Sequence, residues 1–297
     1  MITQPANIQL IAIDIDGTLL TPQKTISSRT REAIQAAQEA GIIVTLATAR
    51  RYENSKHFAD ELGIDIPLIT CDGALIIDHP AADVLHTQLL EAHIAQQAVD
   101  ILIEYDLQPI IHHIDGTMEQ TWSGLAEFDN PELAGYFQEF PRVHRLTHAQ
   151  LCLGQPDPIR VVSFASEEAI ARVAPFVAQL PCAWNTIKRG NYGTAEITIM
   201  HADCSKATGV LRLAHHLNIP LANVMALGDN NNDREMIKAA GWGVAMGQAP
   251  AEVKAIANAV TTTNLEDGVA VAIERYALGS ERARNEASNS LNRATCL

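Results

Sequence analysis

The chain has 297 residues, enough for one large or two modest domains, and its hydrophobic share of 47% and charged share of 19% are typical of a soluble globular protein. Its formal net charge of −14, from 21 basic and 35 acidic residues, argues against a nucleic-acid-binding protein, which needs a basic surface. This charge does not exclude an anionic small substrate, because a bound divalent cation can reverse the local field.

The first predicted element is a strand over residues 8–13. This apolar run lacks polar alternation, a pattern typical of a strand buried on both faces in a parallel sheet. Asp14, Asp16 and Gly17 follow at its carboxyl end. If the extended geometry continues to Asp16, the two carboxylates point to the same side and suit a divalent cation or proton transfer. Aspartate and glycine are also ordinary turn formers, so this stretch alone is equally compatible with a simple exit from the strand.

Helix and strand patterns then alternate. The expected elements are a helix from Ser27 or Ser28 to residue 40, a strand at residues 42–47, a helix at 54–62 and a strand at 67–71. This β-α-β-α-β order predicts the first part of a doubly wound sheet. Thr48 follows the second strand and Asp72 the third.

The pattern changes near residue 81 and resumes after residue 203. Segments of mixed polarity between these points predict an inserted α+β domain on an antiparallel sheet. Its expected elements are helices at 91–107 and 167–180 and strands at 109–114, 158–164, 182–187 and 195–200, the last two joined through residues 189–193. The predicted domains are a core in two parts, residues 1–82 and 204–278, and a cap at residues 83–203. The polar segment 279–297 lacks apolar periodicity, and we expect it to be mobile or loosely docked.

Two adjacent histidine pairs stand out, His112-His113 and His215-His216. Adjacent residues on a strand point to opposite faces, so one pair cannot easily chelate one ion. We therefore expect these histidines at the surface.

The second part of the core repeats the α/β alternation. Helices are expected at 206–217, 234–240, 250–258 and 269–278, and strands at 224–227, 242–247 and 259–262. The strand at 224–227 ends in the acidic run from Gly228 to Asp233. Lys206, in the first turn of its helix, opposes the helix macrodipole, which indicates either a nearby anion or a simply exposed lysine.

Ligands of doubly wound sheets bind where the strands end. The carboxyl edge of the predicted sheet carries carboxylates, the Thr48 hydroxyl and Lys206. Mg²⁺ prefers oxygen ligands, and a transferred phosphoryl group needs positive charge around its oxygens. This set of groups therefore suits magnesium-dependent phosphoryl transfer.

On these motifs, the chain from Ile8 to Leu278 resembles the haloacid dehalogenase-like hydrolase superfamily and, within it, the Cof-type phosphatases with a large α+β cap. The motifs, in order, are Asp14-Ile15-Asp16-Gly17-Thr18, Thr48-Ala49-Arg50, Lys206 and Gly228-Asp229-Asn230-Asn231-Asn232-Asp233. The first and the fourth together are highly specific. The resemblance implies an α/β fold with a doubly wound parallel sheet, a Rossmann-like core, and the inserted α+β cap.

The resemblance also implies a role for each site residue. By this resemblance Asp14 would attack phosphorus and form an aspartyl-phosphate, while Asp16 would protonate the leaving oxygen and later deprotonate the attacking water. The Mg²⁺ ligands implied are the Asp14 carboxylate, the Asp16 backbone carbonyl and Asp229. The groups expected to grip the phosphate are the Ile15 N–H, Thr48, the Ala49 N–H, Lys206 and Asn232. Asp233 is expected to orient Lys206 or a metal-bound water.

Three positions depart from the pattern of the subgroup. Ala49 stands where glycine is usual, which would strain a backbone of positive φ. Asp72 stands where asparagine is usual and adds a negative charge near the expected phosphate site. Gln248 replaces a commoner asparagine.

We therefore expect a magnesium-dependent phosphatase that hydrolyses phosphate monoesters of small metabolites, with sugar phosphates favoured. A phosphomutase with the same intermediate and a catalytically weak phosphometabolite sensor are the alternatives. We expect a small phosphorylated metabolite as partner, no nucleic acid, no membrane, and a monomer or small homo-oligomer. Five widely spaced cysteines without a C-x-x-C pair, and a first segment without signal-peptide features, indicate the cytoplasm.

Overall fold

The computed structural model describes residues 7–116, 118–188 and 194–279. The first apolar run forms strand β1 (Leu10–Ile13), whose four side chains are all buried. It pairs in parallel with β2 (Ile43–Leu46) on one side and β12 (Val224–Gly228) on the other. β1 is thus a central strand, which explains why its sequence is apolar without alternation.

The central sheet has the order β14-β13-β12-β1-β2, and all its pairs are parallel. β13 (Trp242–Ala245) and β14 (Ala259–Val260) extend it on one side, and on the other β3 (Leu68–Thr70) is joined to the segment after β2 by a parallel bridge between Ala47 and Ile69. From β1 the chain adds β2 and then β3 on one side of the sheet. From β12 it adds β13 and then β14 on the other side. This reversal between β1 and β12 opens the crevice in which doubly wound sheets bind ligands.

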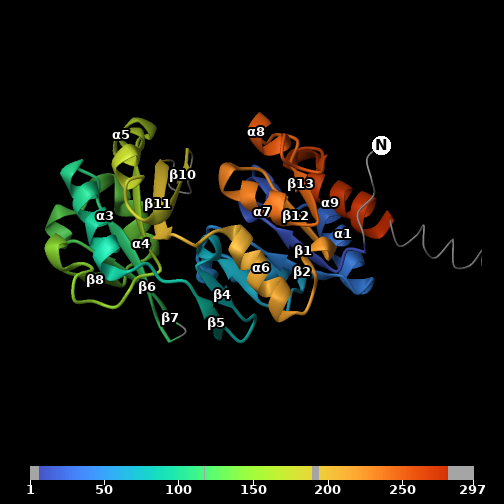
Figure 1. The fold of residues 1–297 in the computed structure, drawn as a ribbon, viewed down its shortest axis with the longest axis horizontal. Helices are drawn as coiled ribbons and strands as arrows, with labels where there is room; N and C mark the ends of the chain where they lie inside the picture. Colours follow the sequence, from blue (N-terminus) through green and yellow to red (C-terminus); the bar gives the residue numbers. More distant parts are fainter. Residues whose placement is uncertain (1–6, 117, 189–193, 280–297) are drawn as a thin grey trace, which may run out of the picture. The chain divides into compact units, whose positions relative to one another are not determined.

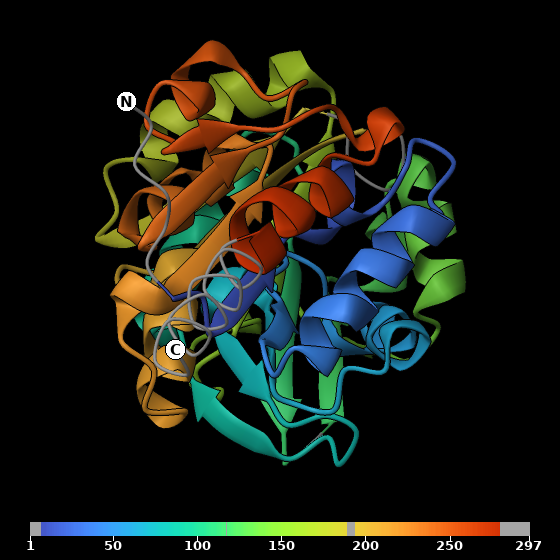
Figure 2. The same cartoon turned by 90° about the vertical axis from the view of Figure 1, so that its right-hand side faces the viewer.

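Helices cover both faces of this sheet (Figure 1). α1 packs against α9 and β2 on one face, whereas α6 packs against α7 on the other (Figure 2). The helices are α1 (Ser28–Glu39), α2 (Lys56–Leu62), α6 (Lys206–His216), α7 (Arg234–Ala239), α8 (Ala251–Lys254) and α9 (Gly268–Ala272). The predicted doubly wound α/β core is confirmed.

The inserted segment forms a second, mainly antiparallel sheet. Its order is β10-β11-β9-β6-β7-β8, and only β7 and β8 pair in parallel. The strands are β6 (Ile110–Asp115), β7 (Met118–Ser123), β8 (Val143–Arg145), β9 (Arg160–Ala165), β10 (Cys182–Ile187) and β11 (Ala195–His201). The predicted α+β cap is confirmed, although β7 and β8 were not expected.

Helices cover both faces of the second sheet as well. α3 (Ala92–Glu104) and α5 (Glu167–Val177) pack on the face that carries Ile111 and Val161. On the opposite face Tyr136 of α4 (Ala134–Glu139) packs against Ile110 and Val162. Across the three described stretches of the chain, no helix combines the length and apolar character that crossing a membrane requires.

The strands β4 (Leu75–Ile77) and β5 (Val84–Thr87) lie where the chain passes from one unit to the other. Contacts divide the chain into a first unit, which comprises the chain up to Gly73, Ile77–Ala81 and the chain from Ser205, and a second unit of Ala74–Ile76 and Ala82–Cys204. That residues 1–82 with 204–278, and residues 83–203, are the domains of the protein stays a prediction. Residues 189–193, and all but the first residue of the segment 279–297, lie outside the described chain.

The prediction that the first histidine pair lies at the surface is wrong. His112 and His113 are 2% and 3% exposed, because β6 lies inside the second sheet with helices on both of its faces. Arg160 Nε donates to His112 Nδ1 at 3.0 Å, whereas the His113 ring packs against the Trp122 ring, tilted by 36° with ring centroids 4.1 Å apart. The other pair, His215 and His216, is exposed at the end of α6.

Candidate active site

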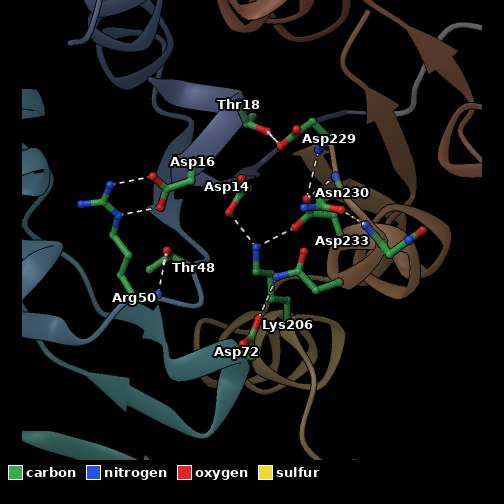
Figure 3. Close-up of polar contacts among 12 residues, drawn as sticks. Asp14, Asp16, Thr18, Thr48, Arg50, Asp72, Lys206, Asp229, Asn230 and Asp233 are labelled. Carbon is green, nitrogen blue, oxygen red and sulfur yellow. Dashed lines mark hydrogen bonds and ion pairs between the residues drawn. The ribbon is translucent and has the colours of Figure 1, made fainter. Parts of the chain in front are cut away.

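Asp14 lies directly after β1 and is buried. Its N–H donates to the Leu227 carbonyl at 3.0 Å, which continues the pairing of β1 with β12. The chain then coils through a tight turn at Ile15–Leu19. As a result, Asp14 faces Lys206 whereas Asp16, on the outer side of the turn, faces Arg50 (Figure 3).

Gly17 makes this turn possible. Its φ of +86° is unfavourable for residues with a side chain. A Cβ atom at this position would also lie 2.5 Å from Asp229 Oδ2. The first motif is therefore packed directly against the fourth, and Thr18 Oγ1 adds a hydrogen bond to Asp229 Oδ1 at 3.1 Å.

Lys206 is 2% exposed, so it is not the simply exposed lysine that the sequence left open. Its Nζ lies 2.6 Å from Asp14 Oδ1 and 2.7 Å from Asp233 Oδ1 (Figure 3). Burial alone would lower the pKa of Lys206, but the charges of Asp14 and Asp233 raise it above its ordinary value. The lysine is therefore a fixed cation, and two carboxylates offset its unfavourable place in the first turn of α6. Ser205 caps that helix by accepting from the Thr208 N–H at 3.1 Å.

Asp233 holds the loop after β12 together. Its Oδ2 accepts from the N–H groups of Asp229, at 3.0 Å, and Asn230, at 2.9 Å, while its Oδ1 accepts from Lys206. Both of its oxygens thus have donors within the protein. This arrangement suits the orienting role expected for Asp233 better than direct metal coordination.

Carboxylate oxygens of Asp14, Asp229 and Asp233 lie within 4.8 Å of one another. Burial raises the pKa of Asp14 well above its usual range, against the opposing effect of Lys206. Burial and the charge of Asp233 raise the pKa of Asp229 to about 7. A single lysine does not neutralise the three carboxylates of this group. A divalent cation with oxygen ligands would supply the missing positive charge, so the donor set fits Mg²⁺.

Thr48 and Ala49 lie at the end of the neighbouring strand. Thr48 is buried, and its Oγ1 accepts from the Arg50 N–H at 3.1 Å. The backbone at Ala49 does not have a positive φ, so alanine in place of the usual glycine causes no strain. The structure brings both residues to the edge of the sheet that carries Asp14.

Asp72 is buried after β3 with φ +54°, a left-handed conformation that aspartate tolerates better than most residues. Its Oδ1 accepts from Asn232 Nδ2 at 3.0 Å. Its charge also adds to those that raise the pKa of Lys206. The unusual aspartate is therefore balanced by an amide donor and a cation, and it fixes the side chain of Asn232.

Four residues at this site had no role assigned from the sequence: Thr18, Arg50, Asp72 and Gln248. Arg50 forms two hydrogen bonds to Asp16, and Gln248 Nε2 donates to the Gly17 carbonyl at 2.5 Å. Thr18 and Arg50 lie within the sequence motifs that define the site, and this membership could have indicated a role for them. The resemblance marked Gln248 as an unusual residue, but it did not indicate this contact with Gly17, from which Gln248 is separated by 231 positions in the sequence.

Comparison with known proteins gives a consistent result over most of the chain. Residues 11–273 match the model of the haloacid dehalogenase-like hydrolase family. The chain is 30% identical over 270 residues to 5-amino-6-(5-phospho-D-ribitylamino)uracil phosphatase YitU of Bacillus subtilis (strain 168), a match covering 90% of this chain and 97% of that protein. It is also 30% identical over 275 residues to pyridoxal phosphate phosphatase YbhA of Escherichia coli (strain K12), covering 88% and 96%.

Among solved structures, a haloacid dehalogenase-like hydrolase from B. subtilis superposes with a TM-score of 0.73 and 25% identity. The match covers 90% of this chain and 99% of that one. The likeness therefore extends over both units and not only over the parallel sheet.

Proposed function

Because the chain belongs to the haloacid dehalogenase-like hydrolases and, within them, to the Cof-type phosphatases, we propose that it hydrolyses phosphate monoesters through an aspartyl-phosphate on Asp14, with Mg²⁺ as cofactor. One observation carries the proposal: Asp14 lies at the crevice between β1 and β12, 2.6 Å from the cation of Lys206 and beside Asp229. A carboxylate with a fixed cation next to it is suited to attack an anionic phosphate.

In the first step, an Asp14 oxygen forms a bond to phosphorus while the bond from phosphorus to the leaving oxygen breaks. Burial raises the pKa of Asp14, and the Lys206 charge counteracts that effect by favouring the ionised form that attacks. In the second step, water cleaves the aspartyl-phosphate and releases phosphate. Asp16 donates a proton to the leaving oxygen in the first step and accepts one from water in the second.

The exposure of Asp16 supports this proposed role. Its side chain is 47% exposed, whereas Asp14 is buried. The carboxylate can therefore meet both a leaving group and an incoming water. Asp14, the Asp16 backbone carbonyl and Asp229 would hold Mg²⁺, whose charge would offset that of the buried carboxylates and of the phosphate.

The remaining groups at the edge of the sheet are proposed to hold the phosphate oxygens. They are the Ile15 N–H, Thr48, the Ala49 N–H, Lys206 and Asn232. The bond from Asn232 to Asp72 supports this proposal for Asn232, because it fixes the amide before substrate binds.

We propose small phosphorylated metabolites as substrates, with sugar phosphates favoured. The relatives named above act on a phosphorylated ribitylamino-uracil and on pyridoxal phosphate. These substrates share a phosphate on a small organic molecule but differ in the leaving group. We propose that the cap discriminates among leaving groups, since the groups at the edge of the parallel sheet are proposed to bind mainly the phosphate.

The test is phosphate release by the purified protein from p-nitrophenyl phosphate and from a panel of phosphorylated metabolites, with Mg²⁺ and with EDTA. We expect Mg²⁺-dependent turnover that Asp14→Asn reduces by orders of magnitude. Asp65→Asn, which changes an exposed aspartate of the same unit, is the matched control. Absence of turnover on the whole panel, or substantial turnover by folded Asp14→Asn, would contradict the proposal. Isomerisation that depends on an added bisphosphate would instead identify a phosphomutase.

A further inference from the structure

Arg50 forms a two-point ion pair with Asp16. Arg50 Nε lies 2.6 Å from Asp16 Oδ2, and Nη2 lies 2.6 Å from Asp16 Oδ1 (Figure 3). The guanidinium plane thus matches the carboxylate plane, a geometry that fixes direction as well as distance. The two residues come from different loops, which follow β1 and β2.

The arginine is itself held from several sides. Its N–H donates to Thr48 Oγ1 at 3.1 Å, and its carbonyl accepts from the Cys71 N–H at 2.9 Å. The guanidinium lies 5.2 Å from the centroid of the Phe58 ring, and Nη1 lies 3.3 Å from the Asn54 carbonyl oxygen. The Arg50 side chain is only 12% exposed, in contrast to 47% for Asp16. A well-anchored cation therefore holds a half-exposed carboxylate.

We propose that Arg50 is the positioning residue of Asp16, setting the direction in which the carboxylate meets the leaving oxygen and the attacking water. The inference rests on the proposed role of Asp16 as proton carrier. A half-exposed aspartate on a turn would otherwise be free to take several rotamers, and only some of them point at the reacting atoms. The two-point contact limits that freedom without placing Arg50 on the substrate.

A competing role for Arg50 is direct binding of the phosphate. Its Nε and Nη2 already donate to Asp16, and the cation next to Asp14 is Lys206. Direct binding would make the contribution of Arg50 independent of the leaving group. If Arg50 instead positions a proton carrier, its contribution should depend on the leaving group, because a poor leaving group needs protonation and a good one does not.

The experiment compares kcat/KM for p-nitrophenyl phosphate and β-glycerophosphate in the wild type, Arg50→Lys, Asp16→Asn and the double variant. Lysine keeps the charge but cannot form the two-point contact. We expect Arg50→Lys to lower kcat/KM about 10-fold or more for β-glycerophosphate, the alkyl ester, and clearly less for p-nitrophenyl phosphate, the aryl ester. A proton carrier contributes about 10²–10⁴-fold, so the loss for the alkyl ester would be part of that contribution. In the Asp16→Asn background the same change should have an effect below about 2-fold, since the proton carrier that Arg50 would position is already lost.

Arg29→Lys is the matched control, because Arg29 makes a similar two-point contact to Glu274, at 3.2 and 2.8 Å, with a half-exposed side chain. It should leave kcat/KM of both esters unchanged. Equal losses on the two esters in Arg50→Lys, or an undiminished loss in the Asp16→Asn background, would overturn the positioning role. Failure of the wild type to hydrolyse these two esters and every member of the metabolite panel would instead refute the proposed phosphatase function, so the two failures are distinguishable.

Discussion

Lys206 Nζ lies 2.6 Å from Asp14 Oδ1, although 192 residues separate the two in the sequence. The second unit is inserted between them, so this contact joins the two halves of the first unit. Asp233 accepts from the same ammonium group at 2.7 Å, and all three side chains are buried. One buried cation thus connects the first, third and fourth motifs.

Replacement of this cation should destabilise the fold. Lys206→Met fills a similar volume but leaves Asp14 and Asp233 buried without their shared partner. Loss of one member of a buried ion pair typically costs about 3–5 kcal/mol, and we expect a decrease of that order in the free energy of unfolding, measured with urea in the absence of Mg²⁺. Lys254→Met on α8, a partly exposed lysine, is the control and should change it by less than about 0.5 kcal/mol. A loss in Lys206→Met no larger than in the control would show that the ion pairs do not stabilise the fold.

Asp16→Asn tests the proposed role of Asp16 as proton carrier. The substitution keeps the backbone carbonyl and the side-chain shape but removes the exchangeable proton. We expect kcat/KM for alkyl phosphates to fall about 10²–10⁴-fold, and the loss to be smaller for aryl phosphates, whose leaving groups need less protonation. The measurement is the ratio of variant to wild-type kcat/KM over a series of esters of differing leaving group. A ratio that is constant along the series would remove Asp16 from the role.

The positions of Asp14 and Asp229 could be predicted from the sequence for a simple physical reason. Strands buried on both faces appear as unbroken apolar runs, and the first polar residue after such a run marks the carboxyl edge of the sheet. The contact between Arg50 and Asp16 could not be predicted in this way, because it depends on the directions of two side chains on separate loops. The positive φ of Asp72 likewise depends on tertiary packing.

Two strands of the cap, β7 and β8, were not predicted for a related reason. β7 (Met118–Ser123) is polar over much of its length, so its sequence lacks the alternation of a half-buried strand. The burial of His112 and His113 has the same origin, because each depends on a neighbour from another part of the sheet: Arg160 donates to His112, and the His113 ring packs against Trp122. The polar and apolar pattern of one segment does not show which residues of other segments will contact it.

His113 should make the stability of the protein depend on pH. Burial, with the neighbouring charge of His144, lowers the pKa of His113 to about 4, whereas an unfolded histidine titrates near 6.5. The folded state therefore resists protonation. The stabilisation is complete above about pH 6.5 and is lost as pH falls towards about 4, with a slope that approaches about 1.4 kcal/mol per pH unit.

Phenylalanine at this position isolates the contribution of His113. His113→Phe keeps an aromatic ring next to Trp122 but cannot titrate, so urea unfolding between pH 4 and 6.5 should show a shallower pH dependence than the wild type. His216→Gln, which removes an exposed histidine of α6, should retain the wild-type dependence. An unchanged slope in His113→Phe would mean that other groups account for the acid sensitivity.

A comparison of Gly17 with Gly41 separates the effect of backbone conformation at Gly17 from the effect of its contact with Asp229. Gly17 and Gly41 have nearly the same φ, +86° and +82°, but a Cβ atom at Gly41 would meet nothing within 4 Å, whereas one at Gly17 would lie 2.5 Å from Asp229 Oδ2. Alanine at either position adds a left-handed strain of about 1–2 kcal/mol. Only Gly17→Ala must also displace the Asp229 carboxylate, which can move because it ends a side chain.

We therefore expect Gly17→Ala to lose at least as much unfolding free energy as Gly41→Ala, because both variants add the backbone strain and only Gly17→Ala also displaces Asp229. The two variants should also respond differently to Mg²⁺. Gly41→Ala should retain the wild-type dependence of activity on Mg²⁺ concentration. Gly17→Ala should need about 10–100-fold more Mg²⁺ for half-maximal activity, the range seen when a metal ligand loses its orientation. The measurement is a Mg²⁺ titration of phosphate release at saturating substrate. If both variants titrate like the wild type, Asp229 does not hold the metal, because a displaced ligand cannot leave the affinity unchanged.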